Sequence, residues 1–576
     1  MPDFVRWWYK LSHPIIMGND KDFERVKILI GKDAFITDLY KRAVAKAEEM
    51  LLKEATVRYL DEINYDAEYN HQRLDVLSFV YFITGEDKYL TAVKKELDAV
   101  CALPDWQTFK FLNTAALGMG VATAYDRIYH AINDEERRRY ISCLKEKLLD
   151  PALVAYDDVG NNPSGNFGWW SKIETNWNAV CNGAVIAAAS VIYDDEKEYC
   201  EGVIEKAINS LKKFIAIFEP HGAFVEGISY WFYANMYMSR GLSALENRIG
   251  GVSKLLSGEG FRKNLLYAEA MNHDAYNFNF HDVGTERRID TSPLMFYARV
   301  LDLPELGRSR VRAFKNGFLP VEDEVNPSDM LWYIPKYSEE IADSEPEDIY
   351  FPVTEICVLR DKDIAIALHG GDNAAIHGHL DNGTVILDAK GKRWLCDLGK
   401  DMLTYSIAGQ KYYRWDLYRM RPEGHNCIVI NPSNAPGQQL DAVAKITRFE
   451  QGDISSAGID LTSSYDKAVS IKRNIVLDKI QRAVEITDDI ALEEESTIYS
   501  FFHTRADVRI EEDTAILTMD GERAEVSCSH PLNVMKAQPL DTSPVIDEQA
   551  ENKDAVKLFI KAENTKCVQF KLKINF

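Results

Sequence analysis

The first 300 or so residues place apolar side chains every three to four positions, the spacing of amphipathic helices. Successive segments are joined by short turns, with no strand-like stretch between them and no fixed repeat of the solenoid kind. This pattern predicts antiparallel helical hairpins, stacked as a bundle or closed into an (α/α) toroid or incomplete barrel. Residues 133–136 (Asn-Asp-Glu-Glu) resemble a helix start with acids in the first turn. Helices are expected at 38–55, 87–102, 110–131, 134–149, 176–193, 199–218, 229–247 and 256–272.

The pattern changes between residues 320 and 352, a stretch rich in proline and acidic residues that we interpret as a domain linker. After it, short runs alternate apolar and polar residues and are separated by turn residues at regular intervals, which predicts an antiparallel β-sandwich. A chain of 576 residues is also too long for one ordinary domain. We therefore expect a multidomain α-then-β protein, with a helical domain at 1–340 and a β-sandwich at 341–576. The strand-like runs are VTEICVLR, DIAIALHG, GTVILDA, RWLCDLG, HNCIVINP, AVSIKRNIVL, RAVEITDDIAL, STIYSFFHT, AVKLFIKA and CVQFKLKINF.

The formal net charge of −23 argues against nucleic acid as the main partner, because binding phosphates requires a concentrated basic face. No apolar run approaches the roughly 18 residues needed to span a bilayer, so no membrane partner is expected. The nine cysteines are odd in number and scattered, without a CxxC pair, which favours reduced thiols. The start, MPDFVRWWYKLSHPII, has no signal-peptide pattern, so we expect a cytoplasmic protein, or a periplasmic or secreted one if a leader was removed.

The segment HGHLDNGTVILDAKGKRWLCDLGKD, residues 377–401, has the composition of a metal site. Side chains alternate along a strand, so His377 and His379 point the same way. Asp397 arrives on a neighbouring strand after the turn at Gly391, and His425 enters a further strand. Two imidazoles and a carboxylate from three strands suit zinc, with ligand distances of roughly 2.0–2.2 Å. The same residues could instead be polar groups at sheet ends that pair with the backbone.

Two stretches of the helical part carry candidate chemistry. In GNFGWWSKIETNWNAVCNGAVIAAAS, residues 165–190, Asn176 opens a helix, where a capping role is the simpler interpretation. The adjoining Trp177 belongs to a tryptophan cluster that could be core or a platform for sugar rings. In EPHGAFVEGISYWFYANMYM, residues 219–238, Glu226 lies near a helix start. Tyr230, Tyr233 and Tyr237 form one stripe, which is more often core or rim than catalytic, although such a Tyr can act as an acid or base.

A third stretch, QKYYRWDLYRMRPEGH at residues 410–425, breaks the negative balance of the chain. It places Arg414, Arg419 and Arg421 among four aromatic residues and ends at His425. A solvated loop is the simple interpretation. A carboxylated or sulfated saccharide is a natural ligand, because guanidinium groups bind such anions in a bidentate way.

Taken together, these motifs resemble the heparinase II/III-like polysaccharide lyases. The resemblance rests on HGHLDNGTVILDAKGKRWLCDLGKD and EGHNCIVINP in the second half, and on TNWNAVCNGA, HGAFVEGISYWFY and NFNFHDVG (277–284) in the first. It implies an (α/α) toroid followed by an antiparallel β-sandwich, with β-elimination at a uronic acid that yields a 4,5-unsaturated product. The implied substrates are anionic polysaccharides or oligosaccharides such as heparan sulfate, chondroitin or hyaluronan.

The resemblance also implies roles for single residues. Asn176 matches the residue that neutralises the uronate carboxylate, Tyr230 the residue that acts as acid or as both base and acid, and His377 the histidine that reaches the sugar. Substrate contacts are expected from Trp177, Glu226, Tyr233, Arg414, Arg419 and Arg421. His379, Asp397 and His425 match the ligands of a structural zinc ion.

Some points stay open at this level. Several relatives carry His directly after the matching Asn, where this chain has Trp177, so the proton abstractor is either His377 or Tyr230. Tyr233 is a second candidate for the tyrosine role, one helical turn away. The alternatives are a lyase acting on alginate or glucuronan, a glycoside hydrolase on an (α/α) toroid that uses carboxylates such as Glu226 and Asp282, and a carbohydrate-binding protein without catalysis.

Overall fold

The computed structural model describes residues 13–53, 57, 66–157, 168–284, 286–318, 325–339, 347–406, 411–511 and 514–576. The chain forms two compact units: unit 1 is Met1–Pro220, Tyr230–Arg262 and Asp290–Glu340, and unit 2 is His221–Ser229, Lys263–Ile289 and Ile341–Phe576. The expected boundary at 340/341 coincides with the end of unit 1. Two short pieces that precede it in the chain nevertheless belong to unit 2. Much of the expected linker, at 320–324 and 340–346, lies outside the described residues.

Unit 1 is built from helices in the order that the periodicity predicts. Asn133 forms a capping box with Glu136 at the start of α6, as its sequence suggests. Two helices contain residues of both units: α10 begins with two residues of unit 2, and α12 ends with residues of unit 2. The helices are α1 (Asp20–Leu29), α2 (Ala34–Leu51), α3 (Ala67–Thr84), α4 (Asp87–Cys101), α5 (Leu112–Ile128), α6 (Asp134–Leu144), α7 (Asp150–Asp157), α8 (Asn176–Val191), α9 (Lys197–Ala216), α10 (Ile228–Arg248), α11 (Val252–Leu255), α12 (Glu259–Ala270), α13 (Pro293–Val300), α14 (Pro304–Lys315) and α15 (Pro327–Trp332).

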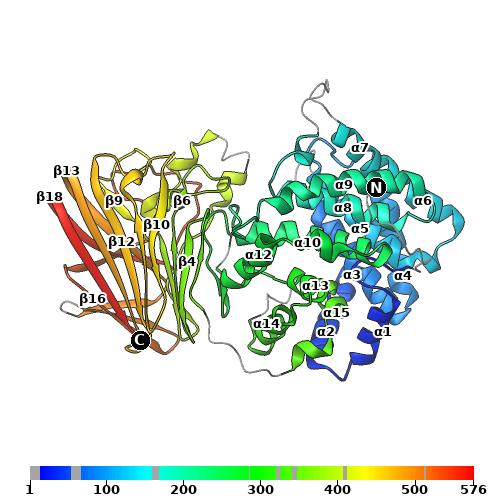
Figure 1. Cartoon of the computed structure of the whole chain (residues 1–576), viewed down its shortest axis with the longest axis horizontal. Coiled ribbons are helices and arrows are strands. Elements are labelled where there is room, and N and C mark those ends of the chain that lie inside the picture. Colours follow the sequence, from blue (N-terminus) through cyan, green and yellow to red (C-terminus); the bar gives the residue numbers. More distant parts are fainter. Residues whose placement is uncertain are drawn as a thin grey trace. The chain divides into compact units, whose positions relative to one another are not determined.

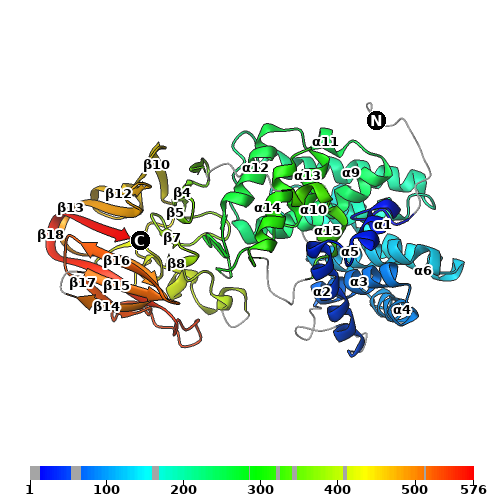
Figure 2. The same cartoon turned by 90° about the horizontal axis from the view of Figure 1, so that it is seen from below.

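Helix α3 is one that the periodicity does not predict. It packs against α5 (Figure 2) and is buried on several sides, so its sequence lacks a single apolar stripe. Its buried charges are paired: Arg73 Nε donates to Glu96 Oε2 at 2.9 Å, and Arg127 donates to Asp75 Oδ1 at 2.7 Å. A helix that buries paired charges shows no amphipathic pattern, because neighbouring helices supply the partners.

Helices α8 and α10 approach each other closely through two glycines. A Cβ atom on Gly183 would lie 2.4 Å from the carbonyl oxygen of Tyr237, and a Cβ atom on Gly241 would lie 2.3 Å from the carbonyl oxygen of Gly183. The small, apolar body of α8 therefore lets the backbones of the two helices touch.

Unit 2 contains two antiparallel sheets (Figure 1). The smaller has the order β3-β4-β5-β7-β8, and the larger has the order β14-β15-β16-β18-β13-β12-β11-β10-β6, with β17 paired to β18 and β9 paired to β13. A separate hairpin pairs β1 (Asn272–His273) with β2 (Tyr276–Asn277). The remaining strands are β3 (Ile349–Phe351), β4 (Ile356–Asp361), β5 (Ile364–His369), β6 (Gly371–Asp372), β7 (Val385–Ala389), β8 (Lys392–Leu395), β9 (Ile428–Ile430), β10 (Val443–Glu450), β11 (Ile454–Asp460), β12 (Ala468–Asp478), β13 (Ala483–Thr504), β14 (Asp507–Glu511), β15 (Thr514–Met519), β16 (Glu522–Cys528), β17 (Leu532–Lys536) and β18 (Val556–Asn575).

The sequence predicts four separate strands from two pairs of runs, but in the structure each pair forms one long strand. RAVEITDDIAL and STIYSFFHT are parts of β13, and AVKLFIKA and CVQFKLKINF are parts of β18. The two strands pair along their length (Figure 1), with a register shift between Ala491 and Ser496. The exposed residues 493–495 form this irregularity, which resembles a turn in the sequence but is a bulge inside one strand.

The core of unit 2 lies between its sheets. Apolar side chains from the smaller sheet, such as Ile366 and Leu387, form one buried cluster with Ile475, Ile486 and Leu572 of the larger sheet. This is the packing of a β-sandwich, in which one face of each sheet is covered by the other. Among the described residues, no helix is long and apolar enough to cross a membrane.

The contact between α8 and α10 can be tested with a matched pair of glycine variants. Gly183→Ala should destabilise unit 1 by roughly 1–3 kcal/mol, because the new methyl group overlaps the Tyr237 carbonyl. Gly202→Ala in α9 meets nothing within 4 Å and should stabilise the helix by about 0.5–1 kcal/mol. Calorimetric unfolding of both variants measures the difference. A shift in the same direction for both would contradict this account of the helix contact.

Candidate functional site

Two backbone segments that are distant in sequence meet in unit 2 at Asp282 and His377. The backbone N–H of Asp282 donates to the carbonyl oxygen of His377 at 3.1 Å. His281 and His377 both have φ of 65°, a conformation that is uncommon for residues other than glycine. Such strained residues persist where the surrounding structure fixes them, and they cluster at functional sites.

The carboxylate of Asp282 is buried and accepts hydrogen bonds from four side chains. Oδ1 accepts from His379 Nε2 at 3.0 Å and from Arg414 at 2.9 Å, and Oδ2 accepts from His377 Nδ1 at 3.1 Å and from the Tyr405 hydroxyl at 2.6 Å. Burial alone would raise the pKa of Asp282, but the hydrogen bonds from His377 and His379, together with the nearby positive charge, hold that pKa well below its ordinary value. The carboxylate is therefore ionised across the physiological pH range.

His377 lies at the exposed edge of this cluster. Its side chain is 21% exposed, and its Nε2 atom is 3.8 Å from Oε2 of the buried Glu226. The ring of Tyr405 stacks against it, with centroids 6.4 Å apart and an angle of 21° between the planes. Nδ1 of His377 therefore faces Asp282 and the Tyr405 hydroxyl, which lies 3.2 Å away, and Nε2 faces Glu226.

The three residues predicted to bind zinc lie together in unit 2. His425 Nδ1 is 2.6 Å from Asp397 Oδ2, and the rings of His379 and His425 have centroids 5.2 Å apart. Each histidine has one nitrogen on a carboxylate, and the other nitrogen, His379 Nδ1 or His425 Nε2, is buried without a hydrogen-bond partner. A carboxylate on one ring nitrogen and a metal on the other is a frequent arrangement for metal-binding histidines.

In this geometry Asp397 orients His425, because its Oδ2 atom faces that ring and its Oδ1 atom accepts from Gly399 N. Among the residues that the structure describes, no group of three His, Cys, Asp or Glu side chains has the geometry of a complete metal site. The donor types and the two buried, unused imidazole nitrogens fit zinc. The zinc site stays a prediction.

A second histidine pair lies beside Asp282. The rings of His281 and His369 meet edge to face with centroids 4.7 Å apart, and His369 lies next to Asp381. Burial, and then the neighbouring His369, lower the pKa of His281 to about 3, so this ring is neutral. The sequence places Asp381 on the face of His377 only if the strand continues. In the structure Asp381 lies beyond a turn and faces this second pair.

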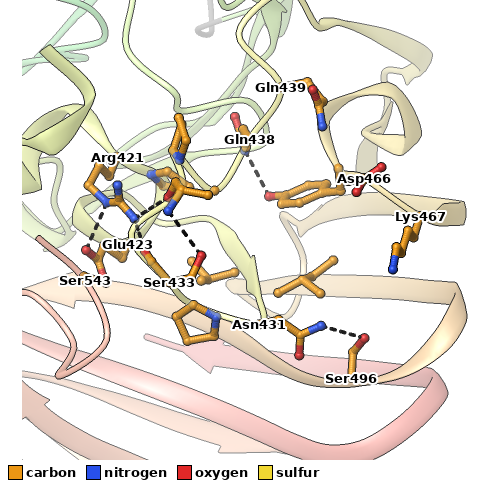
Figure 3. Close-up of a pocket in the computed structure, with 18 of the residues that line it drawn as sticks. Arg421, Glu423, Asn431, Ser433, Gln438, Gln439, Asp466, Lys467, Ser496 and Ser543 are labelled. Carbon is orange, nitrogen blue, oxygen red and sulfur yellow. Dashed lines mark hydrogen bonds and ion pairs between the residues drawn. The ribbon is translucent and has the colours of Figure 1, made fainter. Parts of the chain in front are cut away.

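The three arginines of the basic segment have different surroundings. Arg414 belongs to the Asp282 cluster and is partly exposed. Arg419 donates to Asn552 and to backbone carbonyl groups. Arg421 is 3% exposed and lies at a cavity of about 530 Å³ in the sandwich, where it donates to the carbonyl groups of Ser433 and Ala435 and to Glu423 (Figure 3). Arg421 therefore holds the loop in place through its hydrogen bonds to these carbonyl groups and to Glu423.

The candidate residues of the helical part lie in unit 1, apart from Glu226. Asn176 is buried and is the first residue of α8; the residue at the cap position is Thr175, so the capping interpretation of Asn176 is wrong. Trp177 packs on Trp169 with ring centroids 4.5 Å apart. Tyr230 is half-buried in the first turn of α10.

Tyr233 and Tyr237 both contact Glu68. Burial, and then the charge of Glu68, raise the pKa of both phenols well above the ordinary value. Tyr237 donates to Glu68 Oε1 at 2.7 Å. A phenol that is held on a carboxylate stays protonated, so Tyr233 is poorly suited to remove a proton, which favours Tyr230 for the tyrosine role.

Sequence reasoning missed the centre of the cluster. The sequence patterns offer Asp282 only as a carboxylate of a hydrolase and give no signal for Tyr405. The one signal for Asp282 is its place in NFNFHDVG, a motif of the resemblance that carries no assigned role. No local pattern pairs a residue with partners 95 or 132 positions away in the chain.

A family model described as "Heparinase II/III-like, C-terminal" matches residues 345–565. This part of the chain is heparinase II/III-like. The family resemblance inferred from the sequence is thereby confirmed for the segment that carries His377, His379, Asp397, Arg414 and His425. No curated protein matches the chain.

Several solved structures share the fold of this chain. A structure titled as heparinase III has a TM-score of 0.64 at 12% identity, and the match covers 98% of this chain and 92% of the chain in that structure. The heparan sulfate lyase HepC from Pedobacter heparinus has a TM-score of 0.59 at 11% identity, with coverages of 96% and 92%. The Streptomyces coelicolor A3 chondroitin AC lyase in complex with chondroitin sulphate has a TM-score of 0.57 at 13% identity, with coverages of 96% and 82%. The expected fold class, a helical region followed by an antiparallel β region, is confirmed.

The bracing function of Arg421 gives a testable prediction. Arg421→Ala should destabilise unit 2 by about 3–5 kcal/mol, because it leaves the buried Glu423 without its cation. Arg509→Ala, which removes an exposed ion pair with Glu511, should cost at most about 1 kcal/mol. Urea unfolding followed by circular dichroism compares the two. Equal losses would show that Arg421 does not brace the loop.

Proposed function

We propose that this protein is a polysaccharide lyase that cleaves uronic-acid-containing glycans by β-elimination and yields 4,5-unsaturated uronyl products. The observation that carries the proposal is the heparinase II/III-like segment, in which His377 presents one ring nitrogen at the edge of a buried carboxylate cluster. The lyase titles of the structural relatives support the same reaction class.

The substrate class is a glycosaminoglycan-like anionic chain, of which heparan sulfate, chondroitin and hyaluronan are the first candidates. The titles of two relatives name heparan sulfate and chondroitin sulphate. In this chain the partly exposed Arg414 supplies a guanidinium group beside His377. Alginate and glucuronan oligosaccharides are the alternative substrates, because they share the uronate carboxylate and lack sulfate.

The proposed chemistry needs no redox or nucleotide cofactor. A base removes the proton at C5 of the uronate, the electron pair of the C5–H bond forms the C4=C5 double bond, and the C4–O bond breaks. The leaving oxygen takes a proton from an acid. Asn176 would donate to the uronate carboxylate, where charge builds up, and one such donor is typically worth roughly 3–4 kcal/mol.

His377 and Tyr230 are the two candidates for the base. His377 hydrogen-bonds to the ionised Asp282, and its side chain is partly exposed at the edge of the cluster, which supports His377 as the base. Tyr230 would then protonate the leaving oxygen. Trp177 stands where several relatives carry His, so it offers no base, and its ring, which is tilted against Trp169, is suited to sugar packing.

A glycoside hydrolase that uses Glu226 and Asp282 has less support. The four hydrogen bonds to Asp282 occupy its carboxylate oxygens, and its pKa lies well below the ordinary value. Such a group neither supplies a proton nor activates a water molecule. The acid and the base of a hydrolase would both have to be carboxylates other than Asp282.

Zinc belongs to this proposal as a structural ion. His379 and His425 would hold it through the two buried nitrogens that lack partners, with Asp397 as the third predicted ligand or as the residue that orients His425. Zinc would fix the positions of the segments that carry these residues.

The cysteines are free thiols, which supports a reducing compartment such as the cytoplasm.

The reaction class can be tested with a panel of heparan sulfate, chondroitin, hyaluronan, alginate and glucuronan. A lyase produces an ultraviolet absorbance from the unsaturated uronyl end, and its two products have the summed mass of the substrate. A hydrolase instead adds one water molecule and produces no new absorbance. Binding to a uronide without any cleavage, or a gain of water in the products, would overturn the proposal.

Tyr230→Phe should lower kcat by roughly 10²–10⁴-fold, because it removes the proton that the leaving oxygen needs. The matched control is Tyr125→Phe, since the buried Tyr125 hydroxyl has no hydrogen-bond partner in the described structure. The control should retain the wild-type rate. Initial rates of absorbance increase measure both variants, and an active Tyr230→Phe would assign the proton to another residue.

The zinc prediction is tested by metal analysis of the purified protein. About one zinc per chain is expected, and His425→Ala should lose it, because the variant removes one of the two unused imidazole nitrogens. Removal of zinc with a chelator should lower the melting temperature of wild type but not that of the variant. His130→Ala, at an exposed histidine in unit 1, is the control and should keep the metal. Wild-type protein without zinc after growth in zinc-supplemented medium would contradict the prediction.

A further inference from the structure

We propose that the cavity of about 530 Å³ in the β-sandwich is a second saccharide site, which binds one uncharged sugar unit such as a hexose or an N-acetylhexosamine. The inference goes beyond the proposed function and does not depend on it, because none of the lining residues is Asp282 or one of its four donors. All the lining residues belong to unit 2 and to the part of the chain that the structure describes.

The cavity has walls from segments that are far apart in the chain. The loop that follows β9 forms one wall, and the others are residues 421–423, the loop before β12 and the bulge of β13. Its volume lies within the range of roughly 300–1,000 Å³ that is typical of small-molecule sites. The cavity is therefore large enough to hold a small organic ligand.

The buried part of the lining is mainly apolar. Val429, Leu492 and Tyr465 are at most 5% exposed, and Pro422 is also buried. The Tyr465 hydroxyl donates to the Ile428 carbonyl oxygen at 2.7 Å and accepts from Gln438 at 2.9 Å, so its ring is the part that a ligand can contact. A sugar ring has faces made of C–H groups, and such a face packs well on an apolar surface of this kind.

Two exposed side chains of the lining have unused hydrogen-bonding capacity. In the described part of the chain, the carboxylate of Asp466 accepts no hydrogen bond and the side-chain amide of Gln439 makes none, although the main chain of Gln439 is bonded to Ser464 and Asn373. In Figure 3 both groups lie on one side of the cavity, opposite Arg421. A carboxylate accepts hydrogen bonds, and an amide both donates and accepts, which matches the two capacities of a sugar hydroxyl.

The charges of the lining favour an uncharged ligand. Arg421 pairs with Glu423 at 3.3 Å, and Lys467 pairs with Glu494 at 2.8 Å. The negative charge of Asp466 is then left without a matching cation among the lining residues. A sulfate or carboxylate group on the ligand would be repelled, because like charges at short distance are unfavourable. The cavity therefore differs from the site beside Arg414, where an anionic sugar is expected.

The loop over the cavity is held in place before any ligand binds. Arg421 donates to the carbonyl oxygens of Ser433 at 2.8 Å and Ala435 at 2.7 Å, and Gln438 donates to the carbonyl oxygen of Asn382 at 3.0 Å. Binding to a wall that is already fixed loses less conformational entropy than binding to a free loop.

The binding test uses the full chain and four probes: the methyl glycosides of glucose, galactose, N-acetylglucosamine and N-acetylgalactosamine. Saturation-transfer NMR detects the probes that bind, and titration gives their Kd. At least one probe should bind, and it should bind to His377→Ala with a Kd within about twofold of that of wild type, since the cavity is separate from His377. The proposal is overturned if none of the four binds, or if His377→Ala abolishes binding.

Variants at the two unused groups place the probe in the cavity. Asp466→Ala should raise its Kd by roughly tenfold or more, because a hydrogen bond to a charged group is lost, and Gln439→Ala should raise it by roughly 2–10-fold. Both residues are exposed, so the melting temperature should not change. Asp453→Ala is the matched control, since Asp453 is exposed in the hairpin between β10 and β11 and does not line the cavity. An unchanged Kd in both cavity variants would show that the probe binds elsewhere.

The preference for an uncharged sugar is tested with the 6-O-sulfate ester of the probe that binds best. At neutral pH the ester should bind to wild type at least about tenfold more weakly than the neutral probe. Asp466→Asn should reduce this difference to about threefold or less, because it removes the unbalanced charge. An ester that binds wild type as tightly as the neutral probe would overturn the assignment of an uncharged ligand.

These experiments keep the inference apart from the proposed lyase function. If the uronide panel gives no unsaturated product, the lyase proposal fails while the titrations still decide whether the cavity binds a sugar. If the neutral probes do not bind, the cavity proposal fails while the absorbance assay still decides the reaction class.

Discussion

The hydrogen bonding of one buried carboxylate organises the candidate site in unit 2. Asp282 accepts from His377, His379, Tyr405 and Arg414. Burial of a carboxylate costs free energy unless the group is paired and hydrogen-bonded. All four donors therefore serve to stabilise the same buried charge. The four donors are consequently not independent positions. A change at one of them alters the partners of the others.

This arrangement explains why two pieces of the first half of the chain belong to unit 2. Residues 263–289 pack on the sandwich through main-chain groups: Asn279 donates to the Asp397 carbonyl oxygen at 3.0 Å, and Arg393 donates to the Asn277 carbonyl oxygen at 2.6 Å. The Lys400 N–H also donates to the Val283 carbonyl oxygen. These bonds attach the segment before and after Asp282. They place the carboxylate beside the two histidines on the opposite side of the expected domain boundary.

The candidate site could be predicted in part. Because neighbouring strands bring distant residues side by side, the grouping of His379, Asp397 and His425 followed from their places next to strands. His377 lies in a turn, however, and not on the extended segment that its spacing predicts. The function of Arg421 could not be predicted, because alternation along a chain does not reveal whether a guanidinium meets solvent or buried carbonyl groups. Asp282 could not be found from spacing either, since its partners come from four other positions in the chain.

The sequence by itself determined that a helical region precedes a β region and gave the family likeness of residues 345–565, because periodicity and local motifs depend on neighbouring residues. It did not determine that α3 buries paired charges or that two pairs of runs form the single strands β13 and β18. Only the tertiary structure decided these features and the four partners of Asp282. The physical reason is the same in each case: burial and hydrogen-bond pairing are set by groups that are near in space and far apart along the chain.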